Sequence, residues 1–139
     1  NGQLGLFAST MIQCNTHIVD YVGLVISADS PRIQASDYVL DMTGYSVASG
    51  ETILRLAIDG ELVGNEGRMV NDSRGSKPNV EFRSYVDVET RQLRMALFCC
   101  AAAGIRPGEE LLISYGKGYW ISRGLDLSEM HQHSAALIQ

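Results

Sequence analysis

A stretch in the middle of the chain is built to present polar groups rather than to be buried. It runs from Ala57 to Asn79 and reads AIDGELVGNEGRMVNDSRGSKPN. Glycine, asparagine and serine recur in it, and these residues favour turns that leave backbone groups accessible. Arg68 and Asn71 add a guanidinium and an amide, which act through hydrogen bonds rather than as acids or nucleophiles. We therefore expect this stretch to contribute backbone and amide groups to a site.

Residues that would bind a metal or serve as a dedicated acid or base do not group together. His17, His131 and His133 show no ligand spacing with the cysteines, so we expect no metal site and interpret these histidines as structural or exposed. The segment Gly116–Gly118 is too short for a phosphate-binding loop. The chemistry predicted for this chain therefore needs neither a metal nor a nucleotide phosphate.

Composition and charge point to one domain with a protein partner. The chain has 139 residues, 45% hydrophobic and 19% charged, so we expect a single domain over residues 1–139 with one core and one active site. The formal net charge is -5 and the eleven Lys and Arg residues are scattered, which argues against a direct nucleic-acid site. An acidic domain suits a basic peptide better. On charge alone, an acidity that only keeps the protein soluble explains the composition equally well.

The cysteines and the apolar runs indicate where such a chain would work. Cys14, Cys99 and Cys100 cannot form an even disulfide framework, which is typical of a reducing, intracellular compartment. No apolar run reaches the roughly 20 residues that a membrane-spanning helix needs, so we expect no membrane partner. The sequence carries no signal for a particular oligomeric state.

The elements that must position these residues are predicted to be short strands joined by tight turns. Residues 80–88 alternate apolar and polar side chains, and residues 93–103 follow as the second strand of a hairpin. A helix is expected only in the tail, where Asp126 or Ser128 is a suitable cap. Strands are expected at Gly2–Ala8, His17–Ser27, Tyr38–Met42, Ile53–Ile58, Val80–Val88, Leu93–Ala103 and Glu109–Tyr115.

The central stretch resembles the signature IDA…GNxxRFxNHSCxPN of SET-domain protein lysine methyltransferases. The residues in register are Ile58, Asp59, Gly64, Asn65, Arg68, Asn71, Ser73, Pro78 and Asn79. Three further segments are similar to the family's EYxG, DSYxxD and GEEL…YG motifs, namely residues 20–23, 37–41 and 108–116. The ending at residues 115–120, YGKGYW, also shares features with PR-type SET domains. The resemblance spans Gly2 to Trp120 in the family's order.

The resemblance implies a mainly β SET fold with several small antiparallel sheets, a threaded, knot-like C-terminal segment and a short C-terminal helix. It implies that the Asn71 segment lies against the Tyr115 strand. It also implies a nuclear enzyme that uses S-adenosyl-L-methionine to methylate a lysine in a histone or another basic tail. The insert between Asp29 and Thr52 would contribute to the choice of substrate.

The resemblance also assigns roles to individual residues. Tyr115 would be the catalytic tyrosine and Tyr21 would line the same channel, with Phe82 and Ile113 as channel walls. Contacts to the cofactor would come from the backbone of Gln3, Leu4 and Asp72, from the side chains of Tyr38, Arg68 and Asn71, and from packing of Trp120 on the adenine.

Methyl transfer explains why such residues would be needed. The reaction is an in-line displacement, so catalysis consists mainly of alignment and exclusion of water. The lysine amine, with an ordinary pKa of about 10.4, loses its proton more easily in an apolar channel beside a sulfonium charge. Oriented carbonyl oxygens and a tyrosine hydroxyl would hold the methyl group and the amine. A dedicated general base is not required.

Structural roles and departures from the motif leave a second interpretation open. Taken singly, Tyr21, Tyr38 and Tyr115 are more typical of core rings, and the asparagines are more typical of turn residues. Gln3 stands where the family has the first glycine of GxG, and Asp72 stands where it has the histidine of NHS. Arg74 takes the cysteine's place in a loop two residues longer. The alternative is a degenerate SET module that binds a peptide or partner without methyl transfer.

Overall fold

The computed structural model describes residues 4–49, 52–122 and 124. The chain divides into two compact units. The first unit comprises residues 1–17, 69–81 and 98–139, and the second comprises residues 18–68 and 82–97. Among the described residues, no helix is both long and apolar enough to span a membrane.

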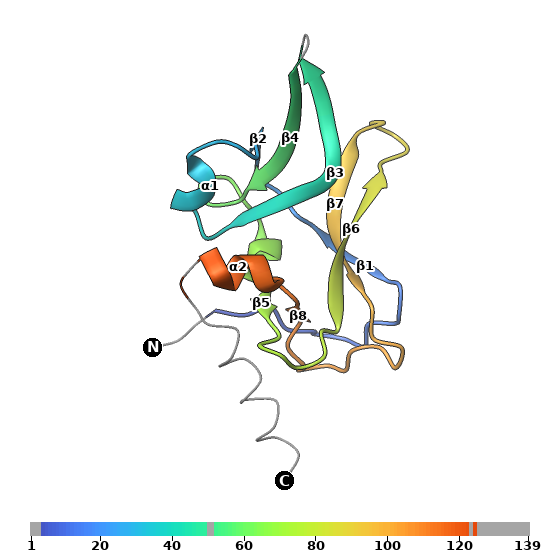
Figure 1. The fold of residues 1–139 in the computed structure, drawn as a ribbon. Coiled ribbons are helices and arrows are strands. Elements are labelled where there is room, and N and C mark those ends of the chain that lie inside the picture. Colours follow the sequence, from blue (N-terminus) through green and yellow to red (C-terminus); the bar gives the residue numbers. More distant parts are fainter. Residues whose placement is uncertain (1–3, 50–51, 123, 125–139) are drawn as a thin grey trace. The chain divides into compact units, whose positions relative to one another are not determined.

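The elements are mostly short strands, as the sequence predicts (Figure 1). The strands are β1 (His17–Asp20), β2 (Leu24–Ser27), β3 (Val39–Ser49), β4 (Thr52–Asp59), β5 (Asn71–Asp72), β6 (Val80–Val86), β7 (Leu93–Cys99) and β8 (Leu112–Ile113). The helices are α1 (Arg32–Ala35), the 3-10 helix η1 (Glu66–Met69) and α2 (Lys117–Ser122). One three-stranded sheet has the order β1-β7-β6.

The second unit is organised around an antiparallel sheet of order β2-β4-β3. The strands β3 and β4 form a long hairpin, visible in green in Figure 1, whose register shifts between Asp41 and Ser46. The strands of this sheet contribute side chains to an apolar cluster, because alternate side chains of a strand share a face. The cluster contains Tyr21, Met42, Ile58 and Met95, with Leu40, Tyr45, Leu56 and Phe82 packed against it.

The first unit contains a small parallel pair, β5-β8, in which Asn71 lies opposite Leu112 and Asp72 opposite Ile113. The N-terminal segment pairs with the chain that leads into β8, since bridges join Phe7 to Glu110 and Ile12 to Ile105. The buried apolar residues of this unit include Ala8, Val70, Val80, Cys99, Ile105, Leu111 and Ile113. The expected contact of the Asn71 segment with the strand before Tyr115 is therefore present.

The mainly β fold class with a short C-terminal helix is confirmed, but several element boundaries were wrong. The expected strand His17–Ser27 is two strands, interrupted at residues 21–23. A Cβ on Gly23 would lie 2.5 Å from the carbonyl oxygen of Asp59, so the chain bends where only glycine fits. The expected strand Leu93–Ala103 ends at Cys99, and Val80–Val88 ends at Val86.

Other boundaries differ because pairing partners, rather than local pattern, decide where a strand ends. Of Gly2–Ala8, the described part makes a single bridge at Phe7, and Glu109–Tyr115 contributes only Leu112–Ile113. The hairpin extends β3 to Ser49, seven residues beyond the expected end at Met42. The short C-terminal helix is α2, which lies earlier in the chain than the tail helix expected from Asp126 or Ser128, and that expected helix falls outside the described residues.

Candidate functional site

Tyr115 lies two residues after the end of β8 and is held at both its backbone and its hydroxyl. Its hydroxyl donates a hydrogen bond to the carbonyl oxygen of Val70 at 2.7 Å. Its backbone N–H donates to Oδ1 of Asp72, also at 2.7 Å. Val70 and Asp72 flank the first residue of β5, so the parallel pair of strands fixes the orientation of the tyrosine. A hydroxyl that donates its proton in this way presents only lone pairs to any further partner.

Asp72 supplies oriented acceptors at the position where the family motif has histidine. In addition to Tyr115 N–H, its carboxylate accepts the backbone N–H of Arg74 at 2.8 Å. Arg74 has a φ of 48°, and the side-chain bond from Asp72 supports this unusual backbone conformation. The departure at position 72 therefore keeps a structural function, because one carboxylate ties the loop after β5 to Tyr115.

Asn71 connects the N-terminal segment to this pair of strands. Its amide Nδ2 donates to the carbonyl oxygen of Leu4 at 2.9 Å and to Oε1 of Glu110 at 2.7 Å. A Cβ on Gly5 would lie 2.4 Å from the same Glu110 oxygen, so any other residue at position 5 would displace the Glu110 carboxylate from its present place. The donor side of the Asn71 amide is thus used to place the backbone of Leu4, which sequence analysis assigned to the cofactor.

Asn79 is a second amide clamp, which sequence analysis treated only as part of the motif. Its Oδ1 accepts the N–H of Leu112 at 2.8 Å, and its Nδ2 donates to the carbonyl oxygen of Glu110 at 2.8 Å. Its backbone N–H donates to Leu112 O at 3.0 Å. The signal in the sequence was an asparagine that follows Pro78 and directly precedes a strand, where its amide can bind neighbouring backbone groups. Asn79 holds the strand that leads to Tyr115.

The helix α2 places two aromatic rings beside Tyr115. The ring of Tyr119 meets Tyr115 edge to face at 4.7 Å, and the ring of Trp120 lies nearly parallel to that of Tyr115 with centroids 6.2 Å apart. Trp120 is half-buried, and its Nε1 is buried with no hydrogen-bond partner among the described residues. A buried N–H donor without an acceptor is costly. It is therefore suited to an acceptor on a bound molecule.

In the second unit, Tyr21 and Tyr38 are joined by a hydrogen bond. The Tyr21 hydroxyl donates to the carbonyl oxygen of Tyr38 at 2.8 Å. Tyr21 is buried in the apolar cluster, and its ring meets that of Phe82 edge to face at 5.3 Å. The two predicted channel residues of this unit, Tyr21 and Phe82, are thus packed together.

Arg68 is fixed by contacts within its own unit. Its Nη1 donates to the carbonyl oxygens of Gly60 and Glu61 at 2.9 and 2.8 Å. Its guanidinium carbon lies 5.2 Å from the centre of the Tyr38 ring, which is within the range of a cation–π interaction. Two residues that sequence analysis assigned to the cofactor, Tyr38 and Arg68, therefore form one contact pair.

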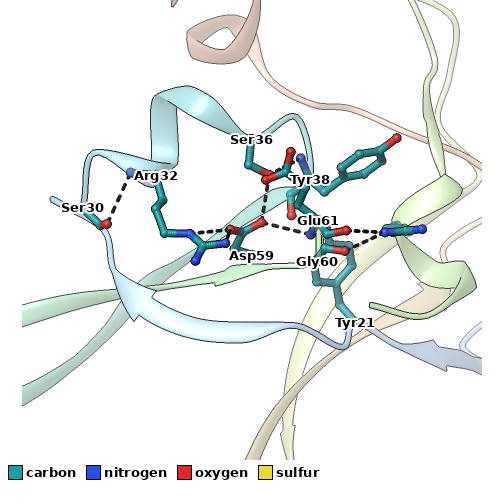
Figure 2. Close-up of polar contacts among 9 residues, drawn as sticks. Tyr21, Ser30, Arg32, Ser36, Tyr38, Asp59, Gly60 and Glu61 are labelled. Carbon is teal, nitrogen blue, oxygen red and sulfur yellow. Dashed lines mark hydrogen bonds and ion pairs between the residues drawn. The ribbon is translucent and has the colours of Figure 1, made fainter. Parts of the chain in front are cut away.

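Beside this pair lies Asp59, a buried carboxylate that sequence analysis did not assign to the site (Figure 2). Burial alone would raise the pKa of the Asp59 carboxyl. The hydrogen bonds from the Glu61 N–H, the Ser36 hydroxyl and the Arg32 guanidinium outweigh burial and hold this pKa below its ordinary value. The signal in the sequence was an acid at the end of the apolar run ILRLAI, directly before Gly60.

A second carboxylate, Asp20, closes β1 just before Tyr21. It accepts the Tyr85 hydroxyl at 2.8 Å and Arg94 Nη1 at 3.2 Å, while its backbone oxygen accepts Asn65 Nδ2 at 2.8 Å. The hydrogen bond to Asp20, together with burial, raises the pKa of Tyr85 above its ordinary value. These contacts anchor the backbone next to Tyr21.

The structure groups the predicted residues into two sets. The first unit contains Leu4, Asn71, Asp72, Ile113, Tyr115 and Trp120, and the second contains Tyr21, Tyr38, Arg68 and Phe82. Gln3 lies outside the described residues. Within the part of the chain that the structure describes, no group of three or more His, Cys, Asp or Glu residues could hold a metal ion.

Comparisons with known proteins show the family and the fold of the chain. The family model of the SET domain matches residues 3–116. Among solved structures, the chain is similar to the crystal structure of KRYPTONITE in complex with mCHH DNA, an H3(1-15) peptide and SAH, with 23% sequence identity and a TM-score of 0.58. The match covers 79% of this chain but 20% of the KRYPTONITE chain, and this degree of likeness shows a shared fold. No curated protein sequence matches the chain.

Proposed function

Because the chain belongs to the SET-domain family, we propose that it transfers a methyl group from S-adenosyl-L-methionine to the side-chain amine of a lysine in a protein. The observation that carries this proposal is the double anchoring of Tyr115 by Val70 and Asp72. Such anchoring is what a catalytic tyrosine requires, because alignment supplies most of the catalysis in an in-line displacement.

The role of Tyr115 follows from the direction of its hydrogen bond. Since the hydroxyl gives its proton to Val70 O, its oxygen is an acceptor toward a polarised methyl group and toward the N–H of an attacking amine. An oriented oxygen of this kind stabilises developing charge without reorganising during the reaction. Ile113, two residues earlier and buried, would give the channel an apolar wall that favours the neutral amine.

The residues present suit S-adenosyl-L-methionine. The bound cofactor supplies an electrophilic methyl group on a sulfonium. Trp120 offers an aromatic face and a buried N–H without a partner among the described residues, which suits a nitrogen heterocycle with acceptor atoms. Leu4 would offer backbone beside the cofactor, and Asn71 holds Leu4 there. By resemblance to the family, Tyr38 and Arg68 would also contact the cofactor.

We propose a basic peptide, such as a histone tail, as the substrate, and the nucleus as the site of action. The net charge of -5 favours a lysine-rich partner over a nucleic acid. The KRYPTONITE complex contains an H3 peptide as well as DNA. For this domain we keep the expectation that it has no direct nucleic-acid site.

The proposal is tested first by calorimetric titration of the protein with S-adenosyl-L-methionine. A lysine-rich peptide is then incubated with the protein and the cofactor and analysed by mass spectrometry. We expect saturable binding and a mass increase in steps of one methyl group. A folded domain that binds the peptide but not the cofactor would instead be a degenerate SET module, an alternative favoured by the replacement of the motif histidine by Asp72. Binding of cofactor without transfer to any lysine peptide would also contradict the proposal.

A further inference from the structure

The carboxylate of Asp59 is fully buried, yet methyl transfer itself gives it no role. We propose that Asp59 is a positioning residue that fixes the contact pair of Tyr38 and Arg68. It acts through Ser36 and through the backbone of Gly60 and Glu61. The inference rests on the proposed function, because that function assigns the contact pair to the cofactor.

The first connection runs from Asp59 to Tyr38 through Ser36. The Ser36 hydroxyl donates to Oδ1 of Asp59 at 2.8 Å and accepts the backbone N–H of Tyr38 at 3.1 Å. Ser36 is itself buried, so its hydroxyl has little freedom to choose other partners. The carbonyl oxygen of Tyr38 then accepts the N–H of Gly60 at 2.8 Å and the hydroxyl of Tyr21 at 2.8 Å. One hydroxyl therefore links the carboxylate to the backbone of Tyr38.

The second connection runs from Asp59 to Arg68 through the turn that follows β4. Oδ1 of Asp59 accepts the N–H of Glu61 at 3.0 Å, which closes the turn over Gly60. The two carbonyl oxygens of that turn accept Nη1 of Arg68. Since Arg68 also lies over the ring of Tyr38, both connections end on the same contact pair. Figure 2 shows the carboxylate with Ser36 above it, the turn at Gly60 and Glu61 to its right, and Arg32 to its left.

Arg32 neutralises the buried charge at the centre of this network. Its Nε and Nη2 donate to Oδ2 of Asp59 at 3.2 and 2.9 Å, whereas the Arg32 side chain remains 42% exposed. A buried carboxylate needs a paired cation and satisfied lone pairs, and Asp59 has both. Arg32 is the first residue of α1 and Asp59 is the last residue of β4, so the ion pair fixes this short helix to the end of the strand. Arg32 and Ser36 therefore hold Asp59 in place, although they lie in the insert that was expected to contribute to the choice of substrate.

The test compares cofactor affinity with stability in matched variants. Asp59→Asn keeps the shape of the side chain but removes the charge that Arg32 pairs with. Ser36→Ala removes the hydroxyl that links Asp59 to Tyr38 and keeps the hydrogen bonds of Asp59 to Arg32 and Glu61. The control is Asp29→Asn, which removes the same charge from an exposed ion pair of equal length, since Arg55 Nη2 lies 2.9 Å from Asp29 Oδ1. Each variant is melted by circular dichroism and then titrated with S-adenosyl-L-methionine by calorimetry well below its melting temperature.

We expect the folded Asp59→Asn and Ser36→Ala variants to bind the cofactor at least tenfold more weakly than the wild type, and Asp29→Asn to bind it within twofold. A lower melting temperature with unchanged affinity would overturn the proposal, because Asp59 would then only stabilise the fold. If Asp59→Asn does not fold, Ser36→Ala decides the outcome by the same criterion. Wild-type protein that binds no cofactor would refute the proposed function, and this inference with it, whereas binding by wild type and variants alike would refute the inference alone.

Discussion

Replacing Tyr115 by phenylalanine separates the chemistry of its hydroxyl from the packing of its ring. The ring contacts with Tyr119 and Trp120 are kept, and the hydrogen bond to Val70 O is lost. A neutral, partly buried hydrogen bond contributes a net ~1 kcal/mol to stability. We therefore expect Tyr115→Phe to remain folded, with a melting temperature lower by a few degrees.

The effect on catalysis should be much larger than the effect on stability. By analogy with the loss of one oxyanion-hole donor, removal of the oriented oxygen should lower the rate of methyl transfer on the order of a hundredfold, or ~2.7 kcal/mol in activation free energy. Cofactor affinity should change little, since the hydroxyl belongs to the transfer step. The assay is single-turnover methylation of a lysine peptide, followed by mass spectrometry.

A matched control is Tyr45→Phe, which removes a hydroxyl hydrogen-bonded to Ser84 in the second unit. This variant should lose a similar amount of stability and keep its turnover, because Tyr45 has no assigned role in the reaction. If Tyr115→Phe also kept wild-type turnover, the catalytic assignment of Tyr115 would be refuted. Equal losses of turnover in both variants would mean that loss of stability, not of the oriented oxygen, lowers the rate.

Four further results are expected. Asn71→Ala should abolish measurable cofactor binding in calorimetry, because it releases Leu4, and unchanged affinity would make this segment purely structural. Asp72→Ala should lower the unfolding free energy by about 1–3 kcal/mol in urea titration, because it leaves the Tyr115 N–H unpaired. Ile113→Tyr should shift products toward monomethyl lysine, since its hydroxyl can hold a water where a methylated amine would turn, and wild type that stops at monomethyl would contradict this. The pKa of Asp59 is lowered in the folded state, so its contribution to stability is present above pH ~4 and is lost as pH falls through the lower folded pKa. The melting temperatures of wild type and Asp59→Asn should therefore converge on acidification.

The motif spacing predicted the neighbourhood of Tyr115 correctly. Asn71 and Asp72 lie beside the strand that leads to it, although the sequence places them about forty residues away. Such a contact follows from family resemblance and not from local periodicity, because two-residue strands have no detectable pattern. Local pattern did predict β6 and β7, whose alternation over several residues is set by burial of one face.

What the sequence did not reveal are contacts that depend on side-chain partners brought together by the fold. The sequence identified Asp59 only as part of the motif, and only the structure shows Arg32 and Ser36 beside it. Asp72 looked like a defect in the motif, yet its carboxylate holds Tyr115. Neither role has a periodic signature, since each depends on residues from other elements. The same dependence on partners shortened the expected strand Glu109–Tyr115 to Leu112–Ile113.

The pairing of β5 with β8 has a consequence for the order in which the protein folds. Tyr115 lies 43 and 45 residues from its partners Asp72 and Val70, and Leu4 lies 67 residues from Asn71. Closing such long loops loses chain entropy before any contact compensates for it, and a parallel pair has no tight turn to help. The β3-β4 hairpin should therefore form early and the surroundings of Tyr115 late. During refolding from urea, recovery of cofactor binding should lag behind recovery of β structure in circular dichroism.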